Sequence, residues 1–155
     1  MSQKQKGVAL VEFALVLPFL LLLSVVAIDF GRAIWEYNTL TKSVRDAARY
    51  LSIQTPGDAT AISRARNLMV YGNRSGTGTP LAIGLSLANV PPPTSGVPLS
   101  GCCYWQTAGS GPVIRTITVR ITGYTFRPMF STVFGLQSFG TLTFSDISAT
   151  MRSYL

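Results

Sequence analysis

Apolar residues dominate the first part of the chain, and their main concentration runs from Val8 to Ile28. A helix of these 21 residues, rising about 1.5 Å per residue, is long enough to cross a bilayer core of roughly 30 Å. Glu12 is the only charged residue within the run. A charge at the bilayer centre costs about 3 kcal/mol even on lenient insertion scales, so this carboxylate indicates a functional role. The pattern therefore predicts a transmembrane helix over residues 8–28 whose carboxylate needs a partner.

Beyond this run the apolar residues recur every three or four positions, and the charged residues mostly occupy other faces. This spacing predicts an amphipathic helix over residues 29–53 that continues the first helix and packs against a folded domain. Residues 8–53 would then form one helix about 70 Å long. The residues expected on the packed face are Phe30, Ile34, Tyr37, Leu40, Val44, Ala47, Ala48 and Leu51.

Pro18 lies within the apolar run. A proline inside a helix removes one backbone hydrogen bond, which predicts a kink or a locally loosened turn. Membrane helices also tolerate proline without such a role, and the sequence does not distinguish the two cases.

A second, shorter helix is predicted over residues 58–71. Pro56 and Gly57 interrupt the first helix, and the side chain of Asp58 can cap the next one. This helix has a short apolar face made of Ile62, Ala65, Leu68 and Met69.

Three later segments show the alternation typical of strands that bury one face. They cover residues of about 81–88, 113–126 and 141–152. At Gly123 the alternation changes phase, which predicts a bulge there. These segments predict a small antiparallel sheet, and the fold class is α+β, with the long helix packed on the sheet.

The segment from Pro128 to Gly140 is an apolar connector between the last two strands. Its Phe130 and Phe134 are assigned to the core or to a hairpin lid, with a subunit contact as the alternative, since large exposed apolar patches need an explanation. No cofactor or ligand site is expected from these two rings.

The chain has 155 residues, 47% of them hydrophobic and 12% charged, which fits one modest domain plus a membrane segment. Its formal charge of +7 comes from 13 basic and 6 acidic residues. Because the basic residues are spread along the chain, they indicate solvated faces near anionic lipid, and no nucleic-acid partner is expected.

Catalytic chemistry is not expected. The chain has no histidine, and its acidic residues are dispersed, which removes most metal sites and most acid–base mechanisms. The sequence therefore predicts no catalytic residues, no metal site, no cofactor and no enzymatic activity.

The charges that flank the apolar run predict its orientation. Lys4 and Lys6 precede the run and Asp29 follows it. By the positive-inside rule the N-terminus lies in the cytoplasm, and residues 29–155 form a periplasmic or extracellular head.

Three interpretations of the N-terminus are open. The segment could be a secretory signal cleaved after Ala27, or an uncleaved anchor in which Glu12 has no role. In the third, residues 1–7 are a leader removed by a prepilin peptidase, so that Val8 becomes the N-terminus, because Gly7 lets the backbone enter a protease cleft closely. Glu12 could then pair with the freed α-amino group of a neighbouring subunit and set axial register.

The residues around this point resemble a known family. Gly7, Glu12 and Phe13, followed by Ala14-Leu15-Val16-Leu17-Pro18 and later Ala47-Ala48-Arg49, resemble the TadE-like minor pilins of the tight-adherence (Tad) pilus. That system is a branch of the type IV pilus and type II secretion systems. Two C-terminal segments, Tyr124-Thr125-Phe126-Arg127-Pro128 and Ala149-Thr150-Met151-Arg152, also look like this family.

The resemblance implies a structural role in pilus assembly or adhesion. The expected partners are a prepilin peptidase, other pilins of a Tad pilus, the inner-membrane assembly platform and membrane lipid. The expected location is the bacterial inner membrane as a single-pass pseudopilin, with incorporation into an extracellular pilus. The alternative is a surface-binding module, secreted or membrane-anchored, with an ordinary signal peptide or an uncleaved anchor.

Cys102 and Cys103 are adjacent and precede Tyr104 and Trp105. In an oxidising compartment they could form a vicinal disulfide, bridge to another subunit or remain thiols. The sequence does not choose among these states.

Overall fold

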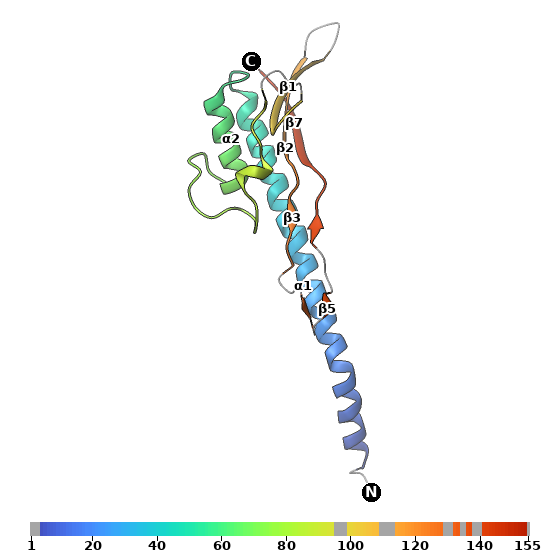
Figure 1. Ribbon diagram of the computed structural model, residues 1–155. Coiled ribbons are helices and arrows are strands. Elements are labelled where there is room, and N and C mark those ends of the chain that lie inside the picture. Colours follow the sequence, from blue (N-terminus) through green and yellow to red (C-terminus); the bar gives the residue numbers. More distant parts are fainter. Residues whose placement is uncertain are drawn as a thin grey trace. The chain divides into compact units, whose positions relative to one another are not determined.

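The structure is a computed structural model, and it has the α+β architecture expected from the sequence (Figure 1). Its contacts divide the chain into two units, Met1–Ile34 with Pro128–Gly140, and Trp35–Arg127 with Thr141–Leu155. We call the second unit the head. The residues that the structure describes are 4–94, 99–108, 114–128, 132–133, 136–137 and 141–154.

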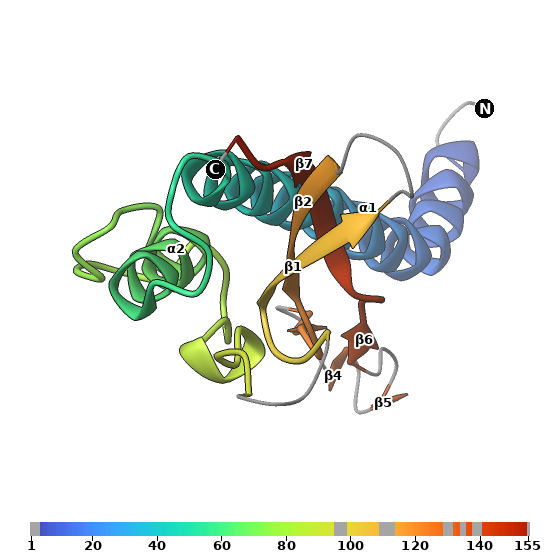
Figure 2. The same ribbon diagram turned by 90° about the horizontal axis from the view of Figure 1, so that it is seen from above.

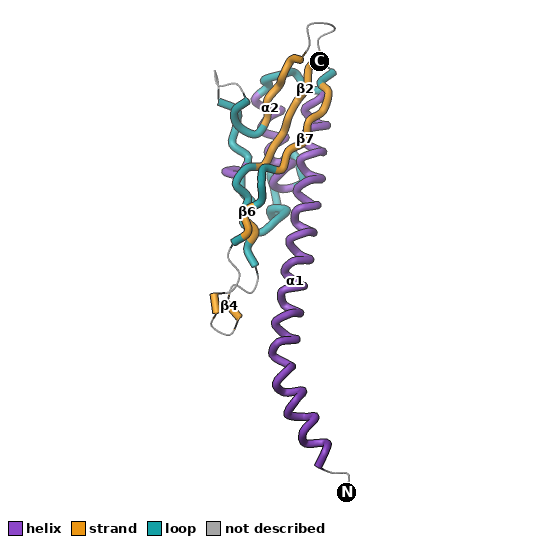
Figure 3. The backbone as a smooth tube through the Cα atoms, turned by 90° about the vertical axis from the view of Figure 1, so that its right-hand side faces the viewer, coloured by secondary structure: helices purple, strands orange, loops and turns teal. Residues whose placement is uncertain are grey.

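Helix α1 is a single continuous helix, Lys4–Ser52, of 49 residues. It joins the two predicted helical segments, which confirms that the membrane-length run and the amphipathic stretch form one element. The helix begins before Val8, because Lys4 to Gly7 are also helical. Pro18 lies inside it, and the helix axis changes direction within its N-terminal half (Figure 3). That Pro18 causes this bend stays a prediction.

The buried face of α1 agrees with the prediction only in part. From Leu40 to Leu51 the predicted apolar residues are fully buried in the head. Phe30 and Ile34, however, are exposed, so their assignment to the packed face is wrong. Tyr37 is only partly covered, and its ring packs edge-on against Phe144 at 5.6 Å between centroids. The buried position near Tyr37 is taken by Glu36, because its carboxylate accepts a hydrogen bond inside the head.

Helix α2 (Ala59–Tyr71) begins at the cap that the sequence predicts. The Asp58 side chain accepts a hydrogen bond from the Thr60 N–H at 2.9 Å. Gly72 ends the helix with φ 71°, a left-handed conformation that glycine adopts without a steric penalty. Its buried residues are Ala61, Ile62, Ala65, Met69 and Val70. The prediction of a helix over residues 58–71 is therefore confirmed, with Asp58 as its cap.

The main sheet has three antiparallel strands in the order β1-β2-β7. They are β1 (Cys103–Ala108), β2 (Ile114–Ile121) and β7 (Ile147–Arg152). A second ladder pairs β3 (Thr125–Phe126) with β6 (Leu142–Thr143). Buried residues of α1, α2 and β2 form one core, and Figures 1 and 2 show α2, β2 and β7 beside α1 in the head.

The predicted strand over residues 113–126 is divided. Residues 114–121 form β2, but the chain leaves the main sheet at Gly123, which has φ 62°, and enters the second ladder at Thr125. The glycine therefore ends a strand, and the predicted bulge is wrong. The buried apolar residues of β2 are at odd-numbered positions, whereas Tyr124 and Phe126, which are also buried, are at even-numbered positions. This agrees with the change of phase in the sequence. Val113 lies outside the described residues.

The segment 141–152 is divided in the same way, because β6 and β7 belong to different ladders. Residues 144–146 connect them. The prediction of strand structure in this segment is confirmed for both pieces.

The prediction of a strand over residues 81–88 is wrong. This segment forms turns followed by the short 3-10 helix η1 (Leu87–Asn89). Gly84, with φ 83°, turns the chain away from an extended path, and Ala82 and Leu85 fill the core from this irregular backbone. The alternation of Leu81, Ile83, Leu85 and Leu87 therefore does not correspond to one strand face. Strand β1, conversely, was not predicted.

The apolar connector contains a two-residue pairing of β4 (Thr132–Val133) with β5 (Leu136–Gln137). Phe130 and Phe134 lie outside the described residues. Their assignment to the core stays a prediction.

Candidate functional site

The N-terminal half of α1 is an apolar helix whose side chains are exposed. Within the described residues, it belongs to the one helix long and apolar enough to cross a membrane, with a mean hydropathy of 2.6 and 0% of that window buried. Leu10, Phe19 and Leu23, at 70%, 75% and 65% exposure, show that the apolar surface surrounds the helix. A helix that is apolar on all faces needs lipid or other helices around it, which fits a single-pass membrane anchor.

Val8 and Glu12 lie one helical turn apart, on the same face of α1. Together with Gly7, Val11 and Leu15 they line one shallow hollow on the helix surface. No ion pair or hydrogen bond of the Glu12 side chain occurs within the described part of the chain. The Glu12 carboxylate is therefore exposed to a partner from outside the described residues. Phe13, the next residue, is 59% exposed.

Gly7 lies in the first turn of α1, which begins at Lys4. Proteases cleave extended backbone, so a protease acting between Gly7 and Val8 would require this turn to open. The first turn of a helix frays easily, and glycine lowers helix stability by about 1 kcal/mol relative to alanine. A Cβ added to Gly7 would meet nothing within 4 Å, so packing within the structure does not require glycine there.

A buried hydrogen bond that the sequence did not indicate connects α1 to the strand region of the head. The Tyr124 hydroxyl donates to Glu36 Oε2 at 2.7 Å and lies 3.2 Å from the Ile83 carbonyl oxygen. Glu36 is 3% exposed and Tyr124 is 2% exposed. Because 88 residues separate the two partners, no local pattern could identify this contact.

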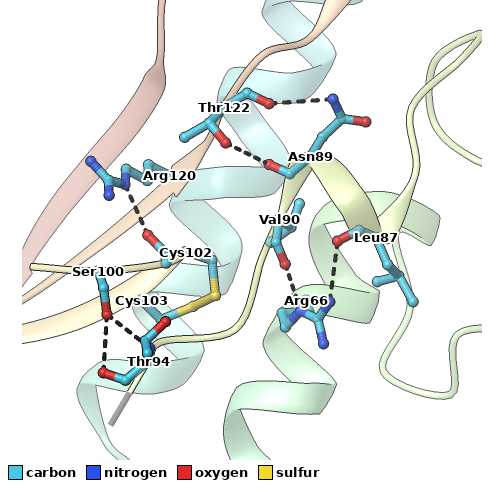
Figure 4. Close-up of a disulfide and its surroundings, with 11 residues drawn as sticks. Arg66, Leu87, Asn89, Val90, Thr94, Ser100, Cys102, Cys103, Arg120 and Thr122 are labelled. Atoms are coloured by element: carbon cyan, nitrogen blue, oxygen red, sulfur yellow. Dashed lines mark hydrogen bonds between the residues drawn. A yellow bond between two sulfur atoms is a disulfide. The ribbon is translucent and has the colours of Figure 1, made fainter. Parts of the chain in front are cut away.

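The two cysteines are joined by a disulfide at the start of β1 (Figure 4). Both are fully buried in the head core. A bridge to another subunit would require these sulfur atoms to become exposed, so of the three open states the structure has the vicinal disulfide. Gly101, with φ 71°, precedes them, and a Cβ there would overlap the Pro92 carbonyl group.

Two arginines hold the backbone on either side of this disulfide. Arg120 of β2 donates from Nε to the Gly101 carbonyl at 2.9 Å. Arg66 of α2 donates from Nε to the Val90 carbonyl at 2.6 Å and from Nη2 to the Leu87 carbonyl at 3.1 Å (Figure 4). No sequence pattern signals these roles, because both are ordinary basic residues within a helix and a strand.

No group of three or more histidine, cysteine, aspartate or glutamate side chains within the described residues could hold a metal ion. The sequence-predicted site residues divide into an N-terminal set on α1 and the disulfide in the head.

A long N-terminal helix with an exposed apolar half, continued into a small α+β head, defines a pilin-like protein with a candidate membrane anchor. Residues 7–49 match the model of a family described as TadE-like protein. No curated protein and no solved structure matches the chain. The resemblance to TadE-like proteins is thus confirmed for the segment that begins at Gly7.

Proposed function

We propose that this chain is a TadE-like minor pilin that takes part in assembly of a Tad pilus. The observation that carries the proposal is Glu12, a lone carboxylate on an exposed apolar helix, five positions after Gly7 and within the family match. A membrane anchor alone does not need this charge, and a charge in an apolar surrounding needs a partner.

In the proposed mechanism a prepilin peptidase removes residues 1–7 and leaves a charged α-amino group on Val8. In an assembled bundle that amino group pairs with Glu12 of a neighbouring subunit. The pair contributes mainly to axial register, because desolvation of the two charges offsets much of their attraction. Other pilins and the inner-membrane assembly platform are the partners that this mechanism requires.

The head lies on the periplasmic side in this proposal, since Lys4 and Lys6 precede the anchor and Asp29 follows it. A surface-binding module with an uncleaved anchor or an ordinary signal peptide is the competing function. A surface-binding module would use the same apolar helix but would not be cleaved after Gly7.

The mature N-terminus tests the proposal. N-terminal sequencing and intact mass of protein from membranes should give a chain that begins at Val8. A start at Ile28 would establish an ordinary signal peptide, and retention of residues 1–7 would establish an uncleaved anchor.

Gly31 provides a matched control for this test. Gly7→Val should block processing, because a branched side chain keeps the backbone out of the protease cleft. Gly31→Val should be processed normally, since Gly31 is also in α1 and a Cβ on it also meets nothing within 4 Å. Equal processing of both variants would contradict cleavage at Gly7.

A further inference from the structure

A groove on the head runs between α2 and the beginning of β1. Its cavity has a volume of about 490 Å³, within the range of roughly 300–1,000 Å³ typical of ligand sites. Ser63 and Arg66 of α2 line one side, and Tyr104 and Trp105 of β1 line the other. The segment Pro92–Thr94 completes the wall. The groove thus combines aromatic surface, hydroxyl groups and one cation.

The strand beside the groove has an open edge. In the order β1-β2-β7, β1 pairs with β2 alone among the described strands. The Arg120 N–H donates to the Cys102 carbonyl at 2.8 Å, which identifies these two residues as a hydrogen-bonded pair of the antiparallel ladder. Because such pairs alternate along a strand, the backbone groups of Trp105 and Thr107 point away from β2. Within the described part of the chain, those groups have no hydrogen-bond partner.

Strand β1 lacks the features that usually protect a sheet edge. Its sequence, Cys-Tyr-Trp-Gln-Thr-Ala, contains no charged residue and no proline. Such an edge presents alternating donors and acceptors at a spacing of about 3.3 Å, which an extended polypeptide matches and a small molecule or a saccharide does not.

Arg66 adds an electrostatic preference. Two backbone carbonyls hold its guanidinium in place, and within the described residues it has no carboxylate partner. A fixed, uncompensated guanidinium in a groove favours a carboxylate ligand. The chain as a whole carries a net charge of +7, which also favours an acidic partner.

We propose that this groove binds an extended segment of another polypeptide, which adds to β1 as a further strand and places a carboxylate on Arg66. This interaction is separate from the assembly role of α1. Cleavage at Gly7 can therefore fail while the groove binds, and the reverse also holds.

The test uses the full chain in lipid nanodiscs and a phage-displayed library of linear random dodecapeptides. We expect selection of peptides with alternating β-branched residues and an aspartate or glutamate. Synthetic copies should bind, and the amide hydrogens of Trp105 and Thr107 should exchange more slowly when they do. Absence of any selected peptide would overturn the proposal.

Thr107 provides the sharpest variant. Its side chain is exposed, and its N–H points to the open edge, where proline is tolerated. Thr107→Pro should weaken peptide binding about tenfold or more, because it removes one donor and its ring blocks the edge. Thr107→Val keeps the N–H and should bind as the wild type does. Equal binding by both variants would overturn strand addition.

Arg66→Gln should weaken binding of acidic peptides about tenfold, while Arg64→Gln should not. Arg64 is exposed on the same helix and does not line the groove, so its variant controls for net charge. If Arg66→Gln does not fold, the acidic residue of the peptide is replaced by its amide, which should cause the same loss. Equal effects of the two arginine variants, or no effect of the amide peptide, would exclude Arg66 as the carboxylate site.

Discussion

At the scale of single residues, Glu12 has the clearest chemical role. Its carboxylate is on an apolar helix surface, one turn from Val8, and has no partner within the described chain. The cost of leaving a charge unpaired in an apolar bundle explains why a subunit contact is expected there. The sequence alone identifies this residue, because a single charge in an apolar run is visible without any structure.

Glu12→Ala should leave synthesis and membrane insertion intact, and removal of a charge from the apolar run should ease insertion. Incorporation into the pilus should fall sharply, because the neighbouring α-amino group would stay unpaired at a cost of about 3–5 kcal/mol. Ser24→Ala is the control, since the Ser24 hydroxyl already donates to the Leu20 carbonyl within the helix. Immunoblots of membranes and sheared pili measure both quantities. Normal piliation by Glu12→Ala, in a strain without the wild-type copy, would exclude pairing by this carboxylate.

The hydrogen bond from Tyr124 to Glu36 gives a second prediction at this scale. Tyr124→Phe should lower the free energy of unfolding of the head by about 1–3 kcal/mol, because the buried Glu36 carboxyl group loses this hydrogen-bond donor. Tyr154→Phe should change it little, because Tyr154 is 77% exposed. Denaturant unfolding in detergent, followed by circular dichroism, measures the difference. Equal stability of the two variants would show that the buried contact contributes nothing.

At the scale of elements, α1 shows where periodicity is reliable and where it is not. Its spacing correctly places Leu40, Val44 and Leu51 in the core, where the head surrounds the helix. Toward the N-terminus the same spacing selects Phe30 and Ile34, which are exposed. Periodicity shows that a face is apolar, but it does not show whether protein or another surrounding covers that face.

Substitutions on the two parts of α1 should separate these roles. Leu40→Ala should destabilise the head by about 2–5 kcal/mol, because it leaves a cavity at a fully buried position. Ile34→Ala should change the free energy of unfolding by less than about 0.5 kcal/mol, since Ile34 is 48% exposed. Chemical denaturation in detergent compares them. A larger effect of Ile34→Ala would mean that Ile34 is packed inside the subunit.

The strands show a different limit of prediction from sequence alternation. Residues 114–121 alternate clearly and form β2, whereas the equally regular alternation over 81–88 forms turns and η1. Strand β1 has weak alternation, yet it pairs along its whole length with β2. A strand exists because a neighbour accepts its hydrogen bonds, and that neighbour is chosen by the tertiary structure.

At the scale of the whole molecule, the chain combines an apolar helix that fits a membrane anchor with a head that contains a buried disulfide. The head core includes Cys102 and Cys103 beside residues of α1 and β2. Disulfides persist in oxidising compartments, so their redox state reports the side of the membrane on which the head lies.

Protein taken from cells should contain Cys102 and Cys103 in oxidised form within one subunit. Mass spectrometry after thiol blocking without reductant should show neither residue alkylated, because both are buried and joined. Non-reducing gels should show a monomer and no disulfide-linked dimer. A reduced and alkylated sample is the control. Complete alkylation of both cysteines without reductant would contradict a periplasmic head.

The sequence by itself determined the features that depend on local order. These are the membrane-length apolar run, the lone Glu12 after Gly7, the single long helix, and the second helix with Asp58 and Gly72 at its ends. Each depends on residues within a few positions of one another, where spacing and capping chemistry decide the outcome.

Only the tertiary structure decided which residues far apart in the chain meet. It pairs Glu36 with Tyr124, makes β1 a strand of the main sheet with one open edge, and separates residues 114–121 from Thr125 at Gly123. It also joins Cys102 to Cys103 inside the core. The physical reason is that hydrogen-bond partners and burial are supplied by segments distant in sequence, whose positions local propensity does not encode.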